Sequence, residues 1–77
     1  MTYLTFGSTH GALKAEATLT SAGIRAQVVP KPTAIRGACG LAVRVRDADA
    51  PRALDVLARA QWPPRQAVTL ASGRGDG

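Results

Sequence analysis

The stretch LAVRVRDADAPRALDVLAR, residues 41–59, changes its hydrophobic period part-way along. Its first five residues alternate between apolar and other positions, which predicts a strand over Leu41–Val45. The inward face would hold Leu41, Val43 and Val45, and the outward face Ala42, Arg44 and Arg46. The later apolar residues recur at helical spacing, which predicts an amphipathic helix. These residues are Ala50, Ala53, Leu54, Leu57 and Ala58. Asp47 or Asp49 would cap this helix, and Pro51 suits its first turn.

The residues nearest the N-terminus predict a similar pair of elements. Alternation over Thr2–Phe6 predicts a strand with Leu4 and Phe6 facing inward. Gly7 would end that strand, and Ser8 or Thr9 is a good N-cap for a helix. Small and apolar residues at helical spacing predict this helix over Ala12–Ala22. Gly23 suits the left-handed position that follows a helix end.

Two further strands are predicted, one on each side of the quoted stretch. Ile24–Val29 would be a strand with Ile24, Ala26 and Val28 inward. Pro30 and Pro32 would end it, because proline has no amide hydrogen to donate, and a loop over Lys31–Gly40 would follow. Trp62-Pro63-Pro64 would end the second helix, with Trp62 covering the end of the core. Gln66–Leu70 predicts the last strand, with Val68 and Leu70 inward.

The order of these elements is β-α-β-β-α-β, which predicts an α+β, ferredoxin-like fold in a single domain over residues 1–70. Its four-stranded antiparallel sheet would have the order 4-1-3-2, with both helices on one face. The turn Gly7–His10, the loop before Leu41 and Trp62 would then share one end of the sheet. Residues 71–77 are polar and glycine-rich, which predicts a disordered tail, and the Arg74-Gly75-Asp76 tripeptide within it is interpreted as chance.

Composition limits the classes of function. The chain has 77 residues and a formal net charge of +5, which permits an anionic partner without requiring one. Aromatic residues are too few to stack bases, so we do not expect nucleic-acid binding. One cysteine and one histidine are too few for a structural zinc site, and no cofactor motif is present. With no secretory signal and no apolar run of the ~20 residues that a membrane span needs, we expect a cytoplasmic protein.

The single cysteine, Cys39, is the candidate functional residue. It lies in the loop Arg36-Gly37-Ala38-Cys39-Gly40, and glycine neighbours would let a partner approach its sulfur. Arg36 and the amino end of the first helix would stabilise its thiolate, which is the form that attacks sulfur. The alternative is a buried, inert cysteine at a strand start. The neighbouring residues also have two interpretations each. Ser8 and Thr9 could cap the helix or bind an anion, and His10 could be a surface residue or a proton donor or acceptor. Arg36 could be a solvated charge instead of a partner of the thiolate.

Several of these motifs together resemble a small bacterial family, the selenium/sulfur carrier protein-like domains. The resemblance spans Tyr3–Leu70 and rests on two signatures, Phe6-Gly7-Ser8-Thr9-His10 and Cys39-Gly40-Leu41-Ala42. It implies that Cys39 carries sulfur or selenium as a persulfide or perselenide, and Gly7, Ser8, Thr9 and His10 match the family's turn. From their positions beside Cys39, Arg36 and Gly40 are expected to support it. The resemblance also implies a cysteine desulfurase-type donor and an acceptor protein. Gly37-Ala38 departs from the family pattern, in which small hydroxyl residues often precede the cysteine.

Two other functions fit the same residues. The domain could be a regulatory module that dimerises or binds a ligand through its uncovered sheet face, which would present Tyr3, Thr5, Arg25, Gln27, Ala42 and Arg44. Cys39 could instead be a thiol redox switch that forms a mixed disulfide with a partner. We do not expect a freestanding enzyme, because the chain is short and has few acid–base groups.

Overall fold

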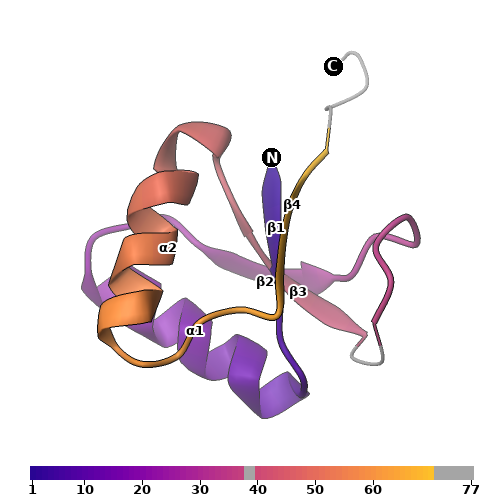
Figure 1. Ribbon diagram of the computed structural model, residues 1–77, viewed down its shortest axis with the longest axis horizontal. Coiled ribbons are helices and arrows are strands. Elements are labelled where there is room, and N and C mark those ends of the chain that lie inside the picture. Colours follow the sequence, from indigo (N-terminus) through magenta and orange to yellow (C-terminus); the bar gives the residue numbers. More distant parts are fainter. Residues whose placement is uncertain (38–39, 71–77) are drawn as a thin grey trace.

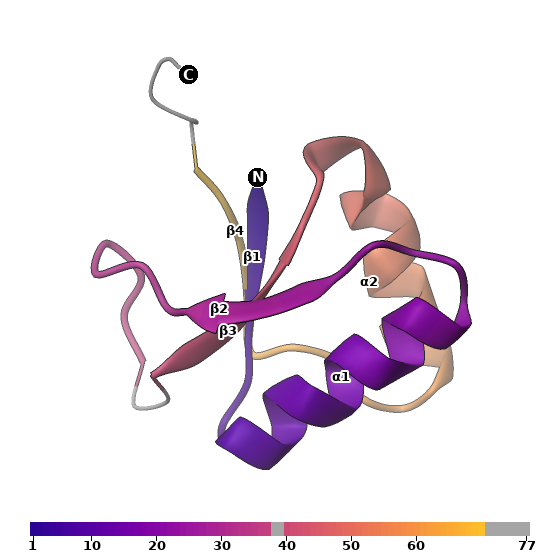
Figure 2. The same cartoon turned by 180° about the vertical axis from the view of Figure 1, so that it is seen from behind.

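The computed structural model describes residues 1–37 and 40–70 of the chain. The elements follow the predicted order: β1 (Thr2–Thr5), α1 (Thr9–Ser21), β2 (Gln27–Pro30), β3 (Leu41–Val45), a 3₁₀ turn (Asp47–Asp49), α2 (Ala50–Arg59) and β4 (Gln66–Thr69). The sheet is antiparallel with the order β2-β3-β1-β4, and both helices lie on one side of it (Figures 1 and 2). The ferredoxin-like α+β prediction is confirmed. The predicted disordered tail, residues 71–77, lies outside the described residues.

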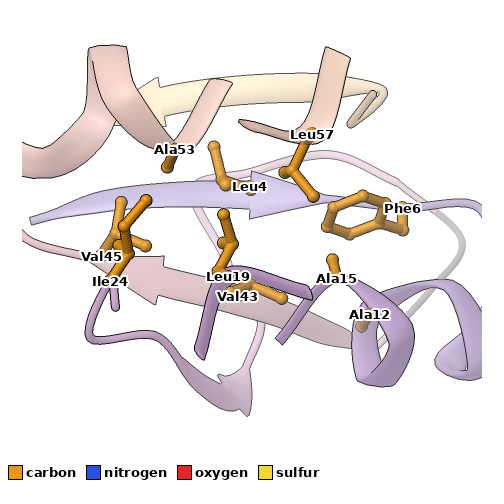
Figure 3. Packing of buried hydrophobic residues seen from close by; sticks show 10 residues of the cluster. All are labelled: Leu4, Phe6, Ala12, Ala15, Leu19, Ile24, Val43, Val45, Ala53 and Leu57. Carbon is orange, nitrogen blue, oxygen red and sulfur yellow. The ribbon is translucent and has the colours of Figure 1, made fainter. Parts of the chain in front are cut away.

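An aliphatic core fills the space between the sheet and the two helices (Figure 3). Its largest fully buried side chains are Leu4, Leu19, Leu57, Val43 and Val45. Alanines on both helices keep the layers close, and Phe6 closes one end of the core. Gly11 has a similar role, because a Cβ there would lie 3.1 Å from Cβ of Phe6. The first turn of α1 therefore packs directly against the residue that follows β1.

Both ends of α1 are fixed by local hydrogen bonds. Ser8 is the N-cap, and its Oγ accepts a bond of 3.1 Å from the Gly11 amide. At the other end Gly23 has a φ of 80°, its amide donates to the Thr20 carbonyl, and the Ile24 amide donates to the Leu19 carbonyl. This pair of bonds is a Schellman motif, in which the residue after the glycine packs back on the helix.

That motif explains one difference from the sequence prediction. The strand predicted at Ile24–Val29 begins only at Gln27, because Ile24 completes the helix end and is buried in the core. The strand also includes Pro30, which pairs with Leu41. Proline is tolerated there because β2 is an edge strand and the missing amide faces outward. On the same edge, the Val28 amide donates to Oε2 of Glu16 on α1, at 2.9 Å.

Two other predictions were wrong in detail. Asp49 occupies the N-cap position of α2 but makes no side-chain cap bond, because its carboxylate pairs with Nε of Arg46 at 2.9 Å. Val68 and Leu70 do not face the core. The register opposes Ala67 to Leu4, so Val68 lies opposite Tyr3 on the other face of the sheet, and Leu70 has the same parity.

The loop between β2 and β3 crosses the sheet face opposite the helices. Ala42 lies on that face as predicted, yet it is fully buried, and its β1 neighbour Thr5 is 3% exposed. Neither belongs to the main core, and Ile35 of the loop is equally buried. Beyond them, Nε2 of Gln66 on β4 donates to the Arg36 carbonyl at 2.7 Å. The loop therefore spans from β2 to β4 and covers one end of this face.

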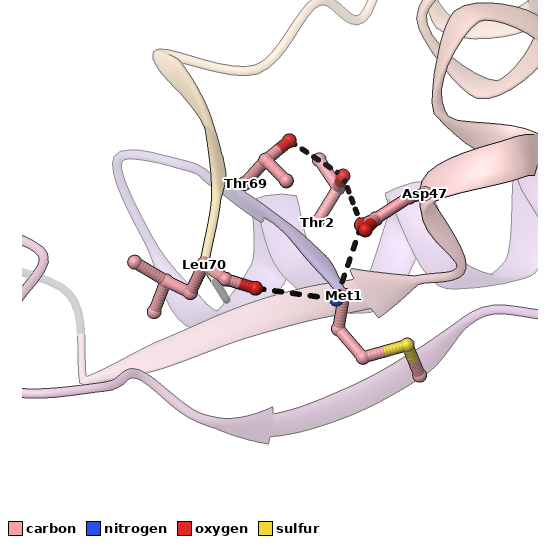
Figure 4. A network of polar contacts seen from close by, with 5 residues as sticks. All are labelled: Met1, Thr2, Asp47, Thr69 and Leu70. Carbon is pink, nitrogen blue, oxygen red and sulfur yellow. Dashed lines mark hydrogen bonds and ion pairs between the residues drawn. The ribbon is translucent and has the colours of Figure 1, made fainter. Parts of the chain in front are cut away.

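The two ends of the described chain meet beside the 3₁₀ turn (Figure 4). The Met1 ammonium lies 3.0 Å from Oδ1 of Asp47 and also donates to the Leu70 carbonyl. The Thr2 hydroxyl bonds Asp47 and Thr69. These contacts tie β1 to β4 and to the segment that leads into α2. Within the described part of the chain, neither helix has the length and apolarity needed to cross a bilayer.

Candidate functional site

A cavity of about 230 Å³ opens at the end of the sheet where β1 stops. Four segments supply its walls: the end of β1, the Gly7 turn, the β2–β3 loop and the start of β4. The lining residues are Thr5, Phe6, Gly7, Lys31, Gly37, Arg65 and Gln66. The topology brings these segments together because β1 lies between β3 and β4.

Arg65 is held against Gly7 at the mouth of this cavity. Its amide donates to the Thr5 carbonyl at 2.7 Å, which fixes the backbone beside the end of β1. A Cβ on Gly7 would lie 2.8 Å from Nε of Arg65, so the hydrogen of glycine leaves the room that the guanidinium occupies. The same two residues, with Phe6, also border a second cavity around Trp62.

The β2–β3 loop is held at its base and at its far side. At the base, the Lys31 amide donates to the Gly40 carbonyl at 2.8 Å. The Lys31 ammonium donates to the Ile35 carbonyl, which places its charge inside the bend of the loop. Gly37 has a φ of 151°, a conformation that favours glycine. Of the described ends of the loop, Gly37 lines the cavity, and Gly40 is bonded to Lys31, which lines it too.

The cavity is positively charged because its cations face no lining carboxylate. Lys31 and Arg65 are the charged residues among those that line it. The acidic residues in the described part of the chain make contacts elsewhere. Glu16 binds the edge of β2, Asp47 the amino terminus, Asp49 Arg46 and Asp55 Arg59. An anion at this rim would therefore meet attraction without a competing acidic group.

A family model for domains described as "Putative Se/S carrier protein-like" matches residues 1–69. The chain belongs to this family. Comparison with curated proteins gives no match, and neither does comparison with solved structures. The matched range thus includes every helix and strand of the fold and all the residues that line the cavity.

The structure brings only some of the predicted site residues of this Se/S carrier-like chain to the cavity. Cys39 lies outside the described residues, so the structure does not test its role. Gly7 borders both cavities, and Ser8 borders the one around Trp62 while capping α1. Gly40 has open space where a Cβ would stand. The Arg36 side chain is exposed, and its carbonyl accepts the bond from Gln66.

His10 and Thr9 lie on the exposed first turn of α1 in this Se/S carrier-like chain. The His10 ring meets Trp62 edge-on, with ring centroids 6.4 Å apart. Trp62 packs against the core, as predicted, and its Nε1 donates to the Gly11 carbonyl at 3.0 Å. Nζ of Lys14 lies 4.2 Å from the centre of its ring, a cation–π contact. Among residues 1–37 and 40–70, no group of His, Asp and Glu side chains gathers to hold a metal ion.

Sequence reasoning about this Se/S carrier-like chain missed the two cations of the cavity, Lys31 and Arg65. A signal for the place of Arg65 was present: it follows Pro63-Pro64 and directly precedes β4, the strand that pairs with β1. In the predicted topology, the start of the last strand lies beside the end of the first, where Gly7 is. The bonds that bend Lys31 into the loop depend on the fold of that loop, which shows no periodic pattern.

Proposed function

We propose that the chain is a sulfur or selenium carrier that holds its cargo atom on Cys39. One observation carries the proposal: Gly37, two positions before Cys39, belongs to a cavity whose lining, in the described part of the chain, holds two cations and no carboxylate. Gly37 lines that cavity, and Gly40 is bonded to Lys31. Nearby cations favour a thiolate and a persulfide anion over their neutral forms.

The chemistry is a transfer of one sulfane sulfur between two thiols. The Cys39 thiolate attacks the outer sulfur of a donor persulfide, and a new S–S bond forms at Cys39. The S–S bond inside the donor breaks, and the donor leaves as a thiolate. One persulfide and one thiolate are present both before and after the transfer, so no external oxidant or reductant takes part. Delivery to an acceptor repeats the same exchange in the forward direction, with Cys39 as the leaving thiolate.

Intact-mass spectrometry tests this assignment directly. We expect the chain, incubated with cysteine, a cysteine desulfurase and its cofactor, to gain the mass of one sulfur atom, which a reductant then removes. The Cys39→Ala variant should gain none. Arg25→Gln, which removes a charge from the separate cleft around Met1 and Gly23, should gain as much as the wild type. An unmodified wild-type chain, or equal gain in Cys39→Ala, contradicts the proposal.

The same assay separates the carrier from a thiol redox switch. A switch would accumulate as a mixed disulfide with the partner protein, with the mass of both chains joined. A carrier accumulates as the chain plus one cargo atom. Repeating the assay with a selenium donor in place of cysteine distinguishes the two cargo atoms, because selenium adds a larger mass with a recognisable isotope pattern.

The geometry favours the carrier over a module that binds through the uncovered sheet face. The β2–β3 loop already occupies part of that face, and Thr5 and Ala42 beneath it are buried. Arg44, in the remaining part, bonds Oε1 of Gln27 on the neighbouring strand. A ligand or a second copy of the chain would have to displace the loop or bind the narrower surface around Tyr3.

A further inference from the structure

Thr5, one of the residues that line the cavity at the end of β1, has a buried hydroxyl without a hydrogen-bond partner in the described part of the chain. Thr5 lines this cavity and is 3% exposed, and its Oγ1 is unpaired among the residues that the structure describes. Buried side-chain polar atoms in proteins nearly always have a partner, and an exception calls for a bound water or ion. Nothing in the carrier chemistry proposed above uses this hydroxyl. An acceptor atom bound within reach of Thr5 would give this hydroxyl the partner that buried polar groups normally have.

The charges around Thr5 define the sign of that ligand. The Arg65 guanidinium lies against Gly7 at the cavity mouth, and in the described chain it takes part in no ion pair. Lys31 contributes a second positive charge from the loop side, while its Nζ bonds the Ile35 carbonyl. No carboxylate lines the cavity in the described part of the chain. A negatively charged group with several acceptor oxygens is the complement of this arrangement.

The volume limits the size of the ligand. The cavity of about 230 Å³ is smaller than the ~300–1,000 Å³ typical of sites for organic ligands. It is several times the ~30 Å³ that one water molecule occupies in the liquid. A small inorganic ion, with a few waters, fits between these limits. A nucleotide or a peptide does not.

We propose that this cavity binds a small tetrahedral oxyanion, with the Arg65 guanidinium and the Thr5 hydroxyl as donors. Sulfur oxyanions such as thiosulfate and sulfate share this chemistry with inorganic phosphate. Lys31 adds attraction through its charge. The site goes beyond the carrier function and does not rest on it, because none of its donors is Cys39. Binding is therefore a property of the pocket that a chain without the thiol retains.

Amide chemical shifts of the full-length chain, measured by NMR, test the proposal. The Cys39→Ala variant is titrated in separate arms with thiosulfate, sulfate and phosphate, and sodium chloride keeps the ionic strength constant. We expect saturable shifts at Thr5, Gly7 and Gln66 in at least one arm, and the strongest arm identifies the source of the anion. Loss of persulfide loading in wild type with these shifts intact would reject the carrier and leave this site standing.

Three variants decide whether the anion sits where proposed. Arg65→Gln should weaken binding at least about tenfold and Thr5→Val about fivefold, as loss of a charge-assisted and a neutral hydrogen bond implies. Arg25→Gln is the matched control: it also removes one positive charge, but it lines the larger cleft around Met1 and Gly23, and binding should be unchanged. No saturable shift with any anion, equal loss in Arg25→Gln, or unchanged binding in Arg65→Gln overturns the proposal.

Discussion

Among single residues, Gly23 has the most clearly defined structural requirement. It occupies a left-handed conformation, and a Cβ added there would meet no atom within 4 Å. Space is therefore not the reason for glycine at this position. The backbone conformation alone requires it, because other residues pay a steric cost in the left-handed region.

Gly23→Ala should consequently lower the free energy of unfolding by about 1–2 kcal/mol, the cost of a left-handed conformation for a residue with a Cβ. Chemical denaturation measures the change. Ser21→Ala is the control, since Ser21 is an exposed residue in the last turn of α1, two positions earlier, and lies in the helix itself. Its effect should stay within about 0.5 kcal/mol. Equal losses in the two variants would show that conformation is not what selects glycine at position 23.

The residues of the candidate site were only partly predictable from the sequence. Gly7 and Ser8 could be predicted because they end a strand and begin a helix, which are local events. The predicted order already placed the start of the last strand beside Gly7, but the packing of the Arg65 guanidinium against Gly7 is a tertiary contact that no local pattern marks. Thr5 reads as an ordinary strand residue on an uncovered face. Its burial arises from a loop that has no periodic pattern.

At the scale of elements, the β2–β3 loop differs most from its prediction. The sequence indicates a long loop, and the structure shows that the loop is a second, smaller layer on the sheet. Ile35 is 3% exposed although it belongs to neither a helix nor a strand. Bonds from Lys31 at the base and from Gln66 on β4 hold the loop over Ala42 and Thr5. Ile35 thus has the packing of a core residue.

Ile35→Ala should therefore destabilise the protein by about 2 kcal/mol or more, as truncation of a buried isoleucine does, and Ile35→Val by about 0.5–1.5 kcal/mol. Thermal or denaturant unfolding gives both values. Leu13→Ala provides the comparison, because Leu13 is 50% exposed and should cost much less. If Ile35→Ala unfolds no more easily than Leu13→Ala, the loop does not pack on the sheet as described.

The regular elements were more predictable than the loop because their patterns are local. Period-two alternation located β1 and β3, and helical spacing located both helices. The prediction was wrong where tertiary contacts set the outcome. Ile24 joined the end of α1 through its bond to Leu19, and the register with β1 turned Val68 away from the core.

At the scale of the whole molecule, the topology followed from the order of six elements, since few arrangements bury two helices on one sheet. What the order does not reveal is how the ends of the sheet are joined. Met1, Thr2 and Asp47 connect β1 with β4 and with the start of α2. The pKa of Asp47 is lowered, first by the hydrogen bond from the N-terminal ammonium and then by that from Thr2.

Because the pKa of Asp47 is lower in the folded protein, its carboxylate stabilises the fold at pH values above ~3.9, the pKa of an unfolded aspartate. This stabilisation is lost as the pH falls through the pKa of the folded state. Asp47→Asn, in a chain with a free amino terminus, should therefore lower Tm modestly at pH 7. The difference from wild type should shrink as the pH falls below about 4. Acetylation of the amino terminus should reproduce the loss at neutral pH. A Tm difference that is constant from neutral to acidic pH would contradict the assignment.

The bond between Glu16 and the Val28 amide has a consequence for assembly. In β2, Val28 and Pro30 have the parity whose amides point away from β3. One of these positions is already bonded and the other carries no hydrogen, so this border of the sheet offers no donor to an incoming strand. An incoming strand would find only carbonyl acceptors on β2, so growth of the sheet, whether in an ordered complex or in a fibril, is favoured at β4.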